Sequence, residues 1–452
     1  MSHRRRSAAL LACAVSITGC TPAVYKLEER FTGAVNGTPF ASAPSSTTAP
    51  LTDLDPASYP LIEAVPALRG ALQVVPLCDC PTPIQRLEHV ASETGTTDAP
   101  VEVYAKQDGA SNHAIYGGNK IRKLELLMAQ ALAAGKSEVV ISGSVGSHSV
   151  VATALVAKHL GLTPQVHLVP QQPSERVTQN LLVLARILAL SLGEDPQLGD
   201  QPVGSLTYHP KSSEAVRDVL STTVRAAFTA DDTPFLCPTG ATSPLTTLAY
   251  INAMHELARD VDAGRLPAVP SRIYVPAGSG GTFIGLLIGA RTIDRFKHTQ
   301  IVPVTSGSGR PTEQYHAHLE AVLAYLHTLT DGDFPAPEIS LDALDAMLDR
   351  DFSGAYGEIT PAGVEAQSLA AQDGLHLEHT YTAKTMARLL HDLRQPDRSL
   401  SEEPEVWLYW NTHHATGDRY AQLAEPPVGP RDLALLQQVF TAAELHTYGL
   451  QP

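Results

Sequence analysis

The chain has 452 residues, of which 43% are hydrophobic and 17% are charged, so it can bury a large core and does not have the composition of a disordered protein. Its net charge is -15, and no long basic block follows Arg6, which argues against a nucleic-acid-binding surface. We therefore expect its partners to be small molecules.

The first 20 residues have the pattern of a targeting signal peptide. Arginines at positions 4–6 precede an apolar run at 8–17 that is too short to span a bilayer. The end of this segment, Ile-Thr-Gly-Cys at 17–20, resembles the bacterial lipobox. The resemblance implies cleavage before Cys20 and lipidation of that cysteine. The resemblance implies a membrane partner: a lipid-anchored protein of the bacterial cell envelope that faces the periplasm or the exterior. Ordinary secretory cleavage and a cytosolic start are the alternatives.

Residues 21–68 are rich in Thr, Ser, Ala and Pro and have no sustained hydrophobic period, which predicts a disordered tether. The folded unit is then expected at 69–452. It holds three cysteines, Cys78, Cys80 and Cys237, too few for a disulfide framework. We interpret these cysteines as structural, with an oxidised pair of Cys78 and Cys80 as the less favoured option.

Strands and helices alternate along the folded unit, which predicts βαβ units, parallel sheets and the α/β class. The expected strands lie at 101–105, 138–142, 165–169, 272–276, 300–305, 375–377 and 406–410. The expected helices lie at 121–134, 150–160, 177–189, 243–260, 283–293, 362–371 and 383–393.

Lys120 lies where a helix should begin, because two glycines and an asparagine precede it and apolar residues recur at helical spacing after it. The positive end of the helix dipole and the charges of Arg122 and Lys123 should lower the Lys120 pKa. The neutral amine is the form that attacks a carbonyl carbon. Taken alone, however, the segment is more simply explained as a solvated basic helix start.

A glycine-rich loop, Gly278-Ser279-Gly280-Gly281-Thr282, follows an expected strand and precedes an expected helix. Backbone N–H groups in such a loop can bind an anion. The loop lacks the P-loop ending and the dinucleotide spacing, so a single phosphate fits it best; a turn needed for close packing is the alternative. A reactive lysine and a site for one phosphate are what pyridoxal 5'-phosphate requires.

These motifs resemble the fold type II pyridoxal-phosphate enzymes, specifically the group of D-cysteine desulfhydrase and 1-aminocyclopropane-1-carboxylate deaminase. The matching segments are 81–83, 117–125, 239–245, 277–282, 355–357 and 380–384. The resemblance implies a two-lobed, tryptophan synthase β-like α/β fold with parallel sheets flanked by helices. It also implies a smaller lobe at about 118–240 inserted in the larger one, and suggests a homodimer.

The resemblance assigns roles to individual residues. Lys120 would bond to the aldehyde of the cofactor and later move the Cα proton of the substrate. Ser147 would lie beside the substrate carboxylate, and Tyr356 and Tyr381 would face the substrate. The expected cofactor-binding residues are Lys120, Lys123, His148, Gly278, Ser279, Gly280, Gly281, Thr282, Thr382 and Thr412.

By the same resemblance, Thr382 occupies the position whose side chain contacts the pyridine nitrogen of the cofactor. The deaminase branch has a carboxylate there, and the desulfhydrase branch has a threonine. A hydroxyl does not hold that nitrogen protonated as a carboxylate would, which favours elimination. The predicted function is a lyase that acts on a small amino acid by β-elimination and, like D-cysteine desulfhydrase, gives pyruvate, ammonia and sulfide. Ring opening of 1-aminocyclopropane-1-carboxylate is the alternative.

Two departures from the family pattern suggest a different class of function. His148 replaces an asparagine, and Asn411-Thr412-His413-His414 replaces His-Thr-Gly-Gly. A changed substrate would explain these residues, and so would a catalytically inactive envelope lipoprotein that keeps the fold as a binding module. Adjacent histidines on a strand are poorly placed to chelate one ion, so we expect no metal site.

Overall fold

The computed structural model describes residues 51–94, 101–189, 204–229, 233–307, 310–395, 405–413, 418–424 and 428–450. The predicted signal peptide, Cys20, most of the expected tether and His414 lie outside these residues. Within the described ranges, no helix is long and apolar enough to cross a membrane.

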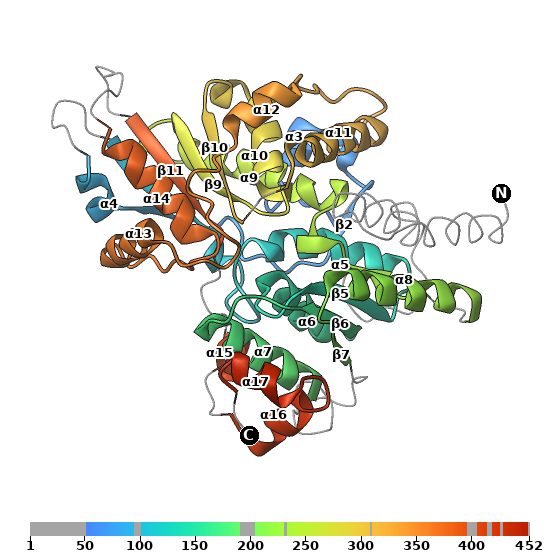
Figure 1. The fold of residues 1–452 in the computed structure, drawn as a ribbon. Coiled ribbons are helices and arrows are strands. Elements are labelled where there is room, and N and C mark those ends of the chain that lie inside the picture. The colour runs from blue at the N-terminus through green and yellow to red at the C-terminus, as the bar shows by residue number, and fades with distance from the viewer. Residues whose placement is uncertain are drawn as a thin grey trace.

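The strands of the described residues form a five-stranded sheet, a four-stranded sheet and one short antiparallel pair (Figure 1). The five-stranded sheet has the order β10-β9-β11-β4-β3 and is parallel except for β3; the four-stranded sheet has the order β7-β6-β5-β8 and is all parallel. The predicted α/β class with parallel sheets is confirmed. The strands are β1 (Thr52–Asp53), β2 (Gln73–Val74), β3 (Ile84–Arg86), β4 (Val101–Gln107), β5 (Glu138–Ser144), β6 (Thr163–Val169), β7 (Ser205–Tyr208), β8 (Phe235–Leu236), β9 (Arg272–Ala277), β10 (Gln300–Thr305) and β11 (Glu405–Asn411).

Helices flank both larger sheets. They are α3 (Leu61–Ala64), α4 (Glu88–Ser92), α5 (Lys120–Ala133), α6 (His148–His159), α7 (Glu175–Ala189), α8 (Ser212–Thr229), α9 (Pro244–Asp262), α10 (Gly281–Thr292), α11 (Thr312–Leu329), α12 (Leu341–Met347), α13 (Pro361–Gln372), α14 (Thr382–Leu393), α15 (Asp418–Ala424), α16 (Pro430–Leu436) and α17 (Ala442–Thr447). The sequence pattern did not reveal α8, α11, α12 or the three C-terminal helices. The strands of the four-stranded sheet lie between β4 and β9 in the chain.

The five-stranded sheet is buried on both faces, as parallel sheets usually are. Along β11, Val406, Leu408 and Trp410 pack into a cluster that includes α9, α10 and α11. The alternate residues Trp407 and Tyr409 pack instead into a cluster that includes α13 and α14. This alternation explains why β11 reads as a continuous apolar run in the sequence.

The prediction of a strand at 375–377 is wrong. Leu375 and Leu377 are buried, but they pack against α13 and α14 without pairing to a strand. Their alternating hydrophobicity therefore reflects side-chain packing in a loop.

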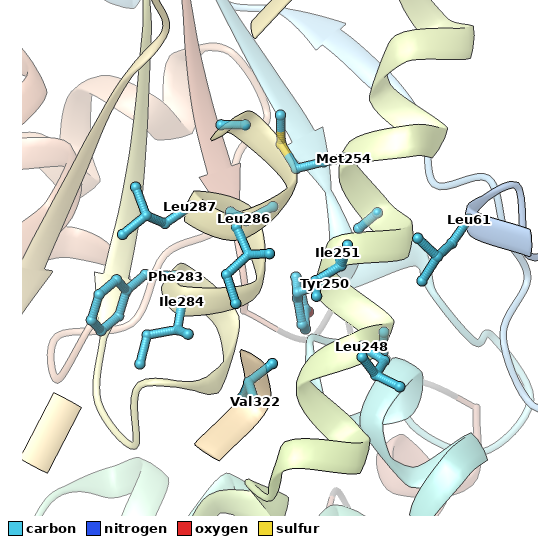
Figure 2. Close-up of a cluster of buried hydrophobic side chains, with 14 of the residues drawn as sticks. Leu61, Leu248, Tyr250, Ile251, Met254, Phe283, Ile284, Leu286, Leu287 and Val322 are labelled. Carbon is cyan, nitrogen blue, oxygen red and sulfur yellow. The ribbon is translucent and has the colours of Figure 1, made fainter. Parts of the chain in front are cut away.

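The close packing of α9 against α10 depends on Gly285. A Cβ at Gly285 would lie 2.4 Å from Tyr250 Cβ and 2.7 Å from the Thr247 carbonyl oxygen, so a larger residue would push the helices apart. Figure 2 shows the resulting layer, in which Phe283 and Leu286 of α10 lie between α9 and the strands. This layer supports the loop at 278–280, which leads directly into α10.

The expectation of a disordered tether as far as residue 68 is wrong for residues 51–68. Leu54, Tyr59, Leu61 and Ile62 are all buried in the same core cluster as α9 and α10. Figure 2 shows Leu61 beside α9, and the Leu61 backbone N–H donates to Asn252 Oδ1 at 3.0 Å. The Ser- and Pro-rich composition concealed a few large apolar residues that dock onto α9.

The last three helices pack onto the lobe that contains the four-stranded sheet. In Figure 1, α15, α16 and α17 lie beside α7, and α15 and α16 contact it. Tyr420, Leu436 and Phe440 are buried in the cluster built around α5, α6 and α7. The chain therefore returns to this lobe after completing the five-stranded sheet at β11.

Cys78 and Cys80 form a disulfide, so the less favoured option for this pair is confirmed. The thiol of Cys237 is buried beside Thr153.

We expect Ile62→Ala to lower the free energy of unfolding by about 2–5 kcal/mol, because Ile62 is fully buried and its removal leaves a cavity. The measurement is chemical denaturation of the purified protein. Val364→Ala, at a position that is 46% exposed, is the control and should change stability little. Equal unfolding midpoints for the two variants would show that residues 51–68 do not contribute to the core.

Candidate active site

The carboxyl ends of β4, β9 and β11 meet at one edge of the five-stranded sheet, because these strands are parallel. Asn119 links the segments that follow them. Its backbone N–H donates to the Thr412 carbonyl at 3.3 Å, after β11, and its side-chain amide donates to Thr282 Oγ1 at 3.2 Å, at the start of α10. Lys120 is the next residue and begins α5, as the sequence predicts.

Lys120 is enclosed by protein but remains partly accessible. Burial lowers its pKa to about 8, and the nearby Cys237 opposes this shift. No side chain in the described ranges forms an ion pair with the Lys120 amine. The neutral, nucleophilic form of the amine is therefore much more populated near neutral pH than in an ordinary lysine, although the protonated form still predominates.

The predicted direction of the Lys120 pKa shift is confirmed, but the role predicted for Arg122 is not. Arg122 Nε donates to Asp108 Oδ1 at 2.9 Å and its Nη1 to Glu256 Oε2 at 2.8 Å, so the guanidinium is neutralised by two buried carboxylates. Although burial alone would raise the pKa of Glu256, the charges of Arg122 and Lys106 lower it to about 2. Arg122 thus anchors α5, and burial rather than its charge lowers the Lys120 pKa.

Glycine residues line the space between the loop at 278–282 and its neighbours. Gly280 has φ +96° and precedes α10 without a side-chain cap on the helix N–H groups. A Cβ at Gly281 would lie 3.0 Å from Lys123 Nζ and 2.9 Å from Thr242 Cγ2, and one at Gly278 would lie 3.0 Å from Tyr381 Cε1. Side chains at these positions would fill the space that an anion needs beside the helix N-terminus.

Polar groups complete this anion site. Lys123 Nζ donates to Thr242 Oγ1 at 3.0 Å, and Thr242 Oγ1 lies 2.6 Å from Ser279 Oγ. Burial, and secondly the charge of Lys120, lower the pKa of Lys123 well below its usual value. No carboxylate in the described ranges pairs with Lys123. An anionic ligand would therefore supply the negative charge that balances this lysine.

Ser147 and His148 lie at the amino end of α6. Ser147 is the N-cap residue, and its Oγ accepts from the Val150 N–H at 3.4 Å. His148 Nδ1 lies 2.8 Å from the Tyr116 hydroxyl. Burial, followed by the charges of Arg176 and Lys120, lowers the His148 pKa to about 3, so the imidazole is neutral.

The structure brings the two unusual histidines together. The rings of His148 and His413 make an edge-to-face contact with centroids 5.7 Å apart. Burial lowers the pKa of His413 well below its usual value. The two departures from the family pattern therefore form one packed pair, although β11 and α6 are far apart in sequence.

Tyr356 and Tyr381 also lie together. The Tyr381 hydroxyl donates to the Tyr356 hydroxyl at 3.1 Å, and the rings meet edge to face at 5.8 Å. Burial raises the pKa of Tyr381 well above its usual value, so this phenol keeps its proton. Tyr356 is 39% exposed, which places it at the solvent side of the pair.

Thr382 begins α14 and is bonded to Glu378. Its Oγ1 accepts from the Glu378 N–H at 2.7 Å and can donate to Glu378 Oε1 at 3.2 Å. The Glu378 carboxylate also accepts three backbone N–H groups, those of Thr380, Tyr381 and Thr382. The Glu378 carboxylate is therefore a direct hydrogen-bond partner of the Thr382 hydroxyl.

Contacts link several of the candidate residues predicted from sequence: Lys123 and Ser279 meet at Thr242 Oγ1, and Tyr381 lies beside Gly278. Lys120 lies close enough to Lys123 and His148 for its charge to lower their pKa values, and Cys20 lies outside the described residues. Thr412 contributes through its backbone carbonyl. Sequence reasoning missed Tyr116, Asn119, Thr242 and Glu378 as members of the site. Tyr116 and Asn119 adjoin the lysine motif, and Glu378 precedes the tyrosine motif, but their contacts come from other segments.

A partly neutral buried lysine beside a glycine-walled anion site defines an enzyme site suited to a cofactor with an aldehyde and a phosphate. Comparison with known proteins agrees: the chain belongs to the family described as pyridoxal-phosphate dependent enzyme, which residues 75–405 match. The predicted family and the predicted cofactor, pyridoxal 5'-phosphate, are confirmed.

Two curated relatives have similar sequences. A putative 1-aminocyclopropane-1-carboxylate deaminase of Pyrococcus abyssi is 28% identical over 334 residues, covering 74% of this chain and 90% of the relative. A D-cysteine desulfhydrase of Salmonella paratyphi B is 28% identical over 334 residues, covering 74% of this chain and 92% of the relative.

A solved structure of a 1-aminocyclopropane-1-carboxylate deaminase homologue matches with a TM-score of 0.60 and 26% identity, covering 84% of this chain and all of that one. The predicted fold type II architecture is thus confirmed.

We expect the rate at which the apoprotein takes up pyridoxal phosphate to rise with pH through about pH 8 and then level off. Below its pKa Lys120 is mostly protonated and cannot attack an aldehyde; above it the amine is mostly neutral. The measurement is the growth of the visible absorption band after mixing, from about pH 6 to about pH 10. A rate that still rises steeply at the upper limit would indicate an ordinary lysine.

Proposed function

We propose that the protein is a lyase that removes the Cα proton of a small amino acid and eliminates a β-substituent, as a D-cysteine desulfhydrase does. With cysteine, loss of sulfide and addition of water would give pyruvate and ammonia. The observation that carries the proposal is Thr382, a hydroxyl rather than a carboxylate at the start of α14, beside the tyrosine pair.

Bound pyridoxal phosphate supplies an electron sink for the charge left at Cα. Gly280, Gly281, Lys123 and Thr242 would hold its phosphate, because their polar groups and open backbone surround the anion site. Lys120, with its lowered pKa, would accept the Cα proton.

The remaining residues would orient the substrate. Ser147 and the amino end of α6 present a hydroxyl and a partial positive charge, which suit the substrate carboxylate. Tyr381 keeps its proton, so its hydroxyl, which now donates to Tyr356, could instead stabilise a departing thiolate by a hydrogen bond. If the Tyr116 hydroxyl donates to His148 Nδ1, the proton of the neutral imidazole is at Nε2, so His148 can act as the donor that an asparagine would be.

The second candidate is ring opening of 1-aminocyclopropane-1-carboxylate, and Glu378 is the observation that favours it. When Thr382 donates its proton to Glu378, the hydroxyl can only accept at the pyridine nitrogen, which favours a protonated nitrogen. The third is a binding module without turnover, favoured by the His148 and His413 pair.

The test of function is a visible spectrum and a product assay on the mature chain with pyridoxal phosphate and D-cysteine, L-cysteine or 1-aminocyclopropane-1-carboxylate. We expect a cofactor band, pyruvate from a cysteine, and no four-carbon keto acid from the cyclopropane. Lys120→Ala should abolish the band and lower turnover by at least about 100-fold. The matched control Lys297→Ala alters a lysine whose side chain is 55% exposed and should leave both unchanged.

Each alternative has its own result in this assay. A four-carbon keto acid would support the deaminase, and a band without any product would support the binding module. No band, or a band that persists in Lys120→Ala, would contradict the proposed role of this lysine.

We also propose that Cys20 carries a lipid that anchors the protein in the cell envelope. The lipobox resemblance supports this, and the disulfide between Cys78 and Cys80 is of a kind that persists in oxidising compartments.

We expect Cys20→Ala to lose incorporation of a radiolabelled fatty acid and to leave the membrane fraction, because the lipid attaches to that thiol. Cys13→Ala, within the predicted signal peptide, is the matched control and should keep the label. Labelled protein in the Cys20→Ala variant would contradict the proposal.

A further inference from the structure

Two histidines and an aspartate converge on the four-stranded sheet, at β6, β7 and α8, which carry none of the candidate active-site residues. His167 is on β6, His209 directly follows β7, and Asp218 is in the second turn of α8. In the parallel pairing of β6 and β7, His167 is opposite Thr207, so His209, two residues further, emerges on the same face as His167. The contact of α8 with β6 brings Asp218 to that face.

The three side chains form a compact triangle of ligand atoms. His167 Nδ1 lies 3.1 Å from His209 Nε2, and Asp218 Oδ2 lies 3.5 Å from the first nitrogen and 3.7 Å from the second. Tetrahedral zinc binds such atoms at about 2.0–2.2 Å, which places neighbouring ligands roughly 3.3 Å apart. The triangle therefore has the size of one face of a zinc coordination tetrahedron.

We propose that His167, His209 and Asp218 bind one Zn²⁺ ion, with water as the fourth ligand. Two imidazoles favour zinc over magnesium or calcium, which prefer oxygen ligands. The His167 and His209 side chains are only 6% and 10% exposed, whereas Asp218 is 44% exposed and leaves the site open to ions and water from solvent. Among the described residues, no further His, Cys, Asp or Glu joins this group.

A hydrogen bond between the two histidines does not explain the whole arrangement. Such a bond needs only the two ring nitrogens, whereas here a carboxylate oxygen also lies at nearly equal distances from both of them. The rings are nearly parallel, with 16° between their planes. Because residues 167 and 209 are 42 positions apart, no ligand spacing was visible in the sequence, and the expectation of no metal site did not consider them.

The ion would fasten α8 to the edge of the sheet. β7 is an edge strand, and the apolar cluster that includes α8 is small, with Leu220 packed against Val140 and Leu236. Coordination would add a link from α8 to β6 and to the end of β7. The ion would therefore have a structural role that is independent of the proposed lyase activity.

The test uses the untagged mature chain after chelator treatment, equilibrated with Zn²⁺ alone and analysed for bound metal. We expect one zinc per chain, a higher thermal midpoint with zinc, and the absorption spectrum of a tetrahedral site when Co²⁺ is substituted. His209→Ala and Asp218→Asn should each weaken zinc binding by at least about tenfold, because each removes a ligand.

His298→Ala changes an exposed histidine outside the cluster and serves as the matched control; it should bind zinc normally. Lys120→Ala should also keep the zinc while losing the cofactor band, which separates this proposal from the proposed function. Far-UV circular dichroism checks folding, and the half-exposed Asp218→Asn decides the matter if His209→Ala does not fold. Absence of zinc from the wild-type chain, or equal zinc in wild type and Asp218→Asn, would overturn the proposal.

Discussion

The buried ion pairs of Arg122 with Asp108 and Glu256 hold the site together. They tie α5 to the end of β4 and to α9, and the Tyr250 hydroxyl, which donates to Asp108 Oδ2 at 2.6 Å, also lies 3.2 Å from the Asn119 carbonyl. Replacing one charged residue of such a network leaves another buried charge unpaired, which is strongly unfavourable. Because Lys120 follows Asn119 directly, its position depends on this network although it makes no ion pair there.

The lysines of this region divide by function according to their partners. Lys106 is buried with Glu256 and Asp260, so it is a structural cation. Lys120 and Lys123 are enclosed without a carboxylate among the described residues, and burial lowers the pKa of each. In a chain of net charge -15, two such amines form a local site for an anion, which suits a phosphorylated cofactor whose aldehyde needs one neutral amine.

The departures from the family pattern are coupled in space. His148 contacts His413 and is hydrogen-bonded to Tyr116, which packs edge to face against Tyr420 of α15. The Tyr420 hydroxyl in turn donates to Asn180 at 2.7 Å. A C-terminal helix therefore supports the residues around His148.

Much of the site was predictable from local sequence. The position of Lys120 at the start of α5 and of the glycine loop before α10 follows from turn residues and helical periodicity, which act over a few neighbouring residues. The α/β class follows in the same way from alternating strands and helices. The family resemblance supplied the expected roles of Ser147 and Tyr381, which the local pattern could not assign.

What the sequence by itself determined was therefore the local geometry: a lysine at a helix start, an uncapped glycine turn and the order of strands and helices. Only the tertiary structure decided that burial, not Arg122, lowers the Lys120 pKa, that Glu378 stands behind Thr382, and that residues 51–68 dock onto α9. The physical reason is the same in each case. Desolvation, ion pairing and cavity filling depend on atoms brought together from distant segments, and no spacing along the chain records them.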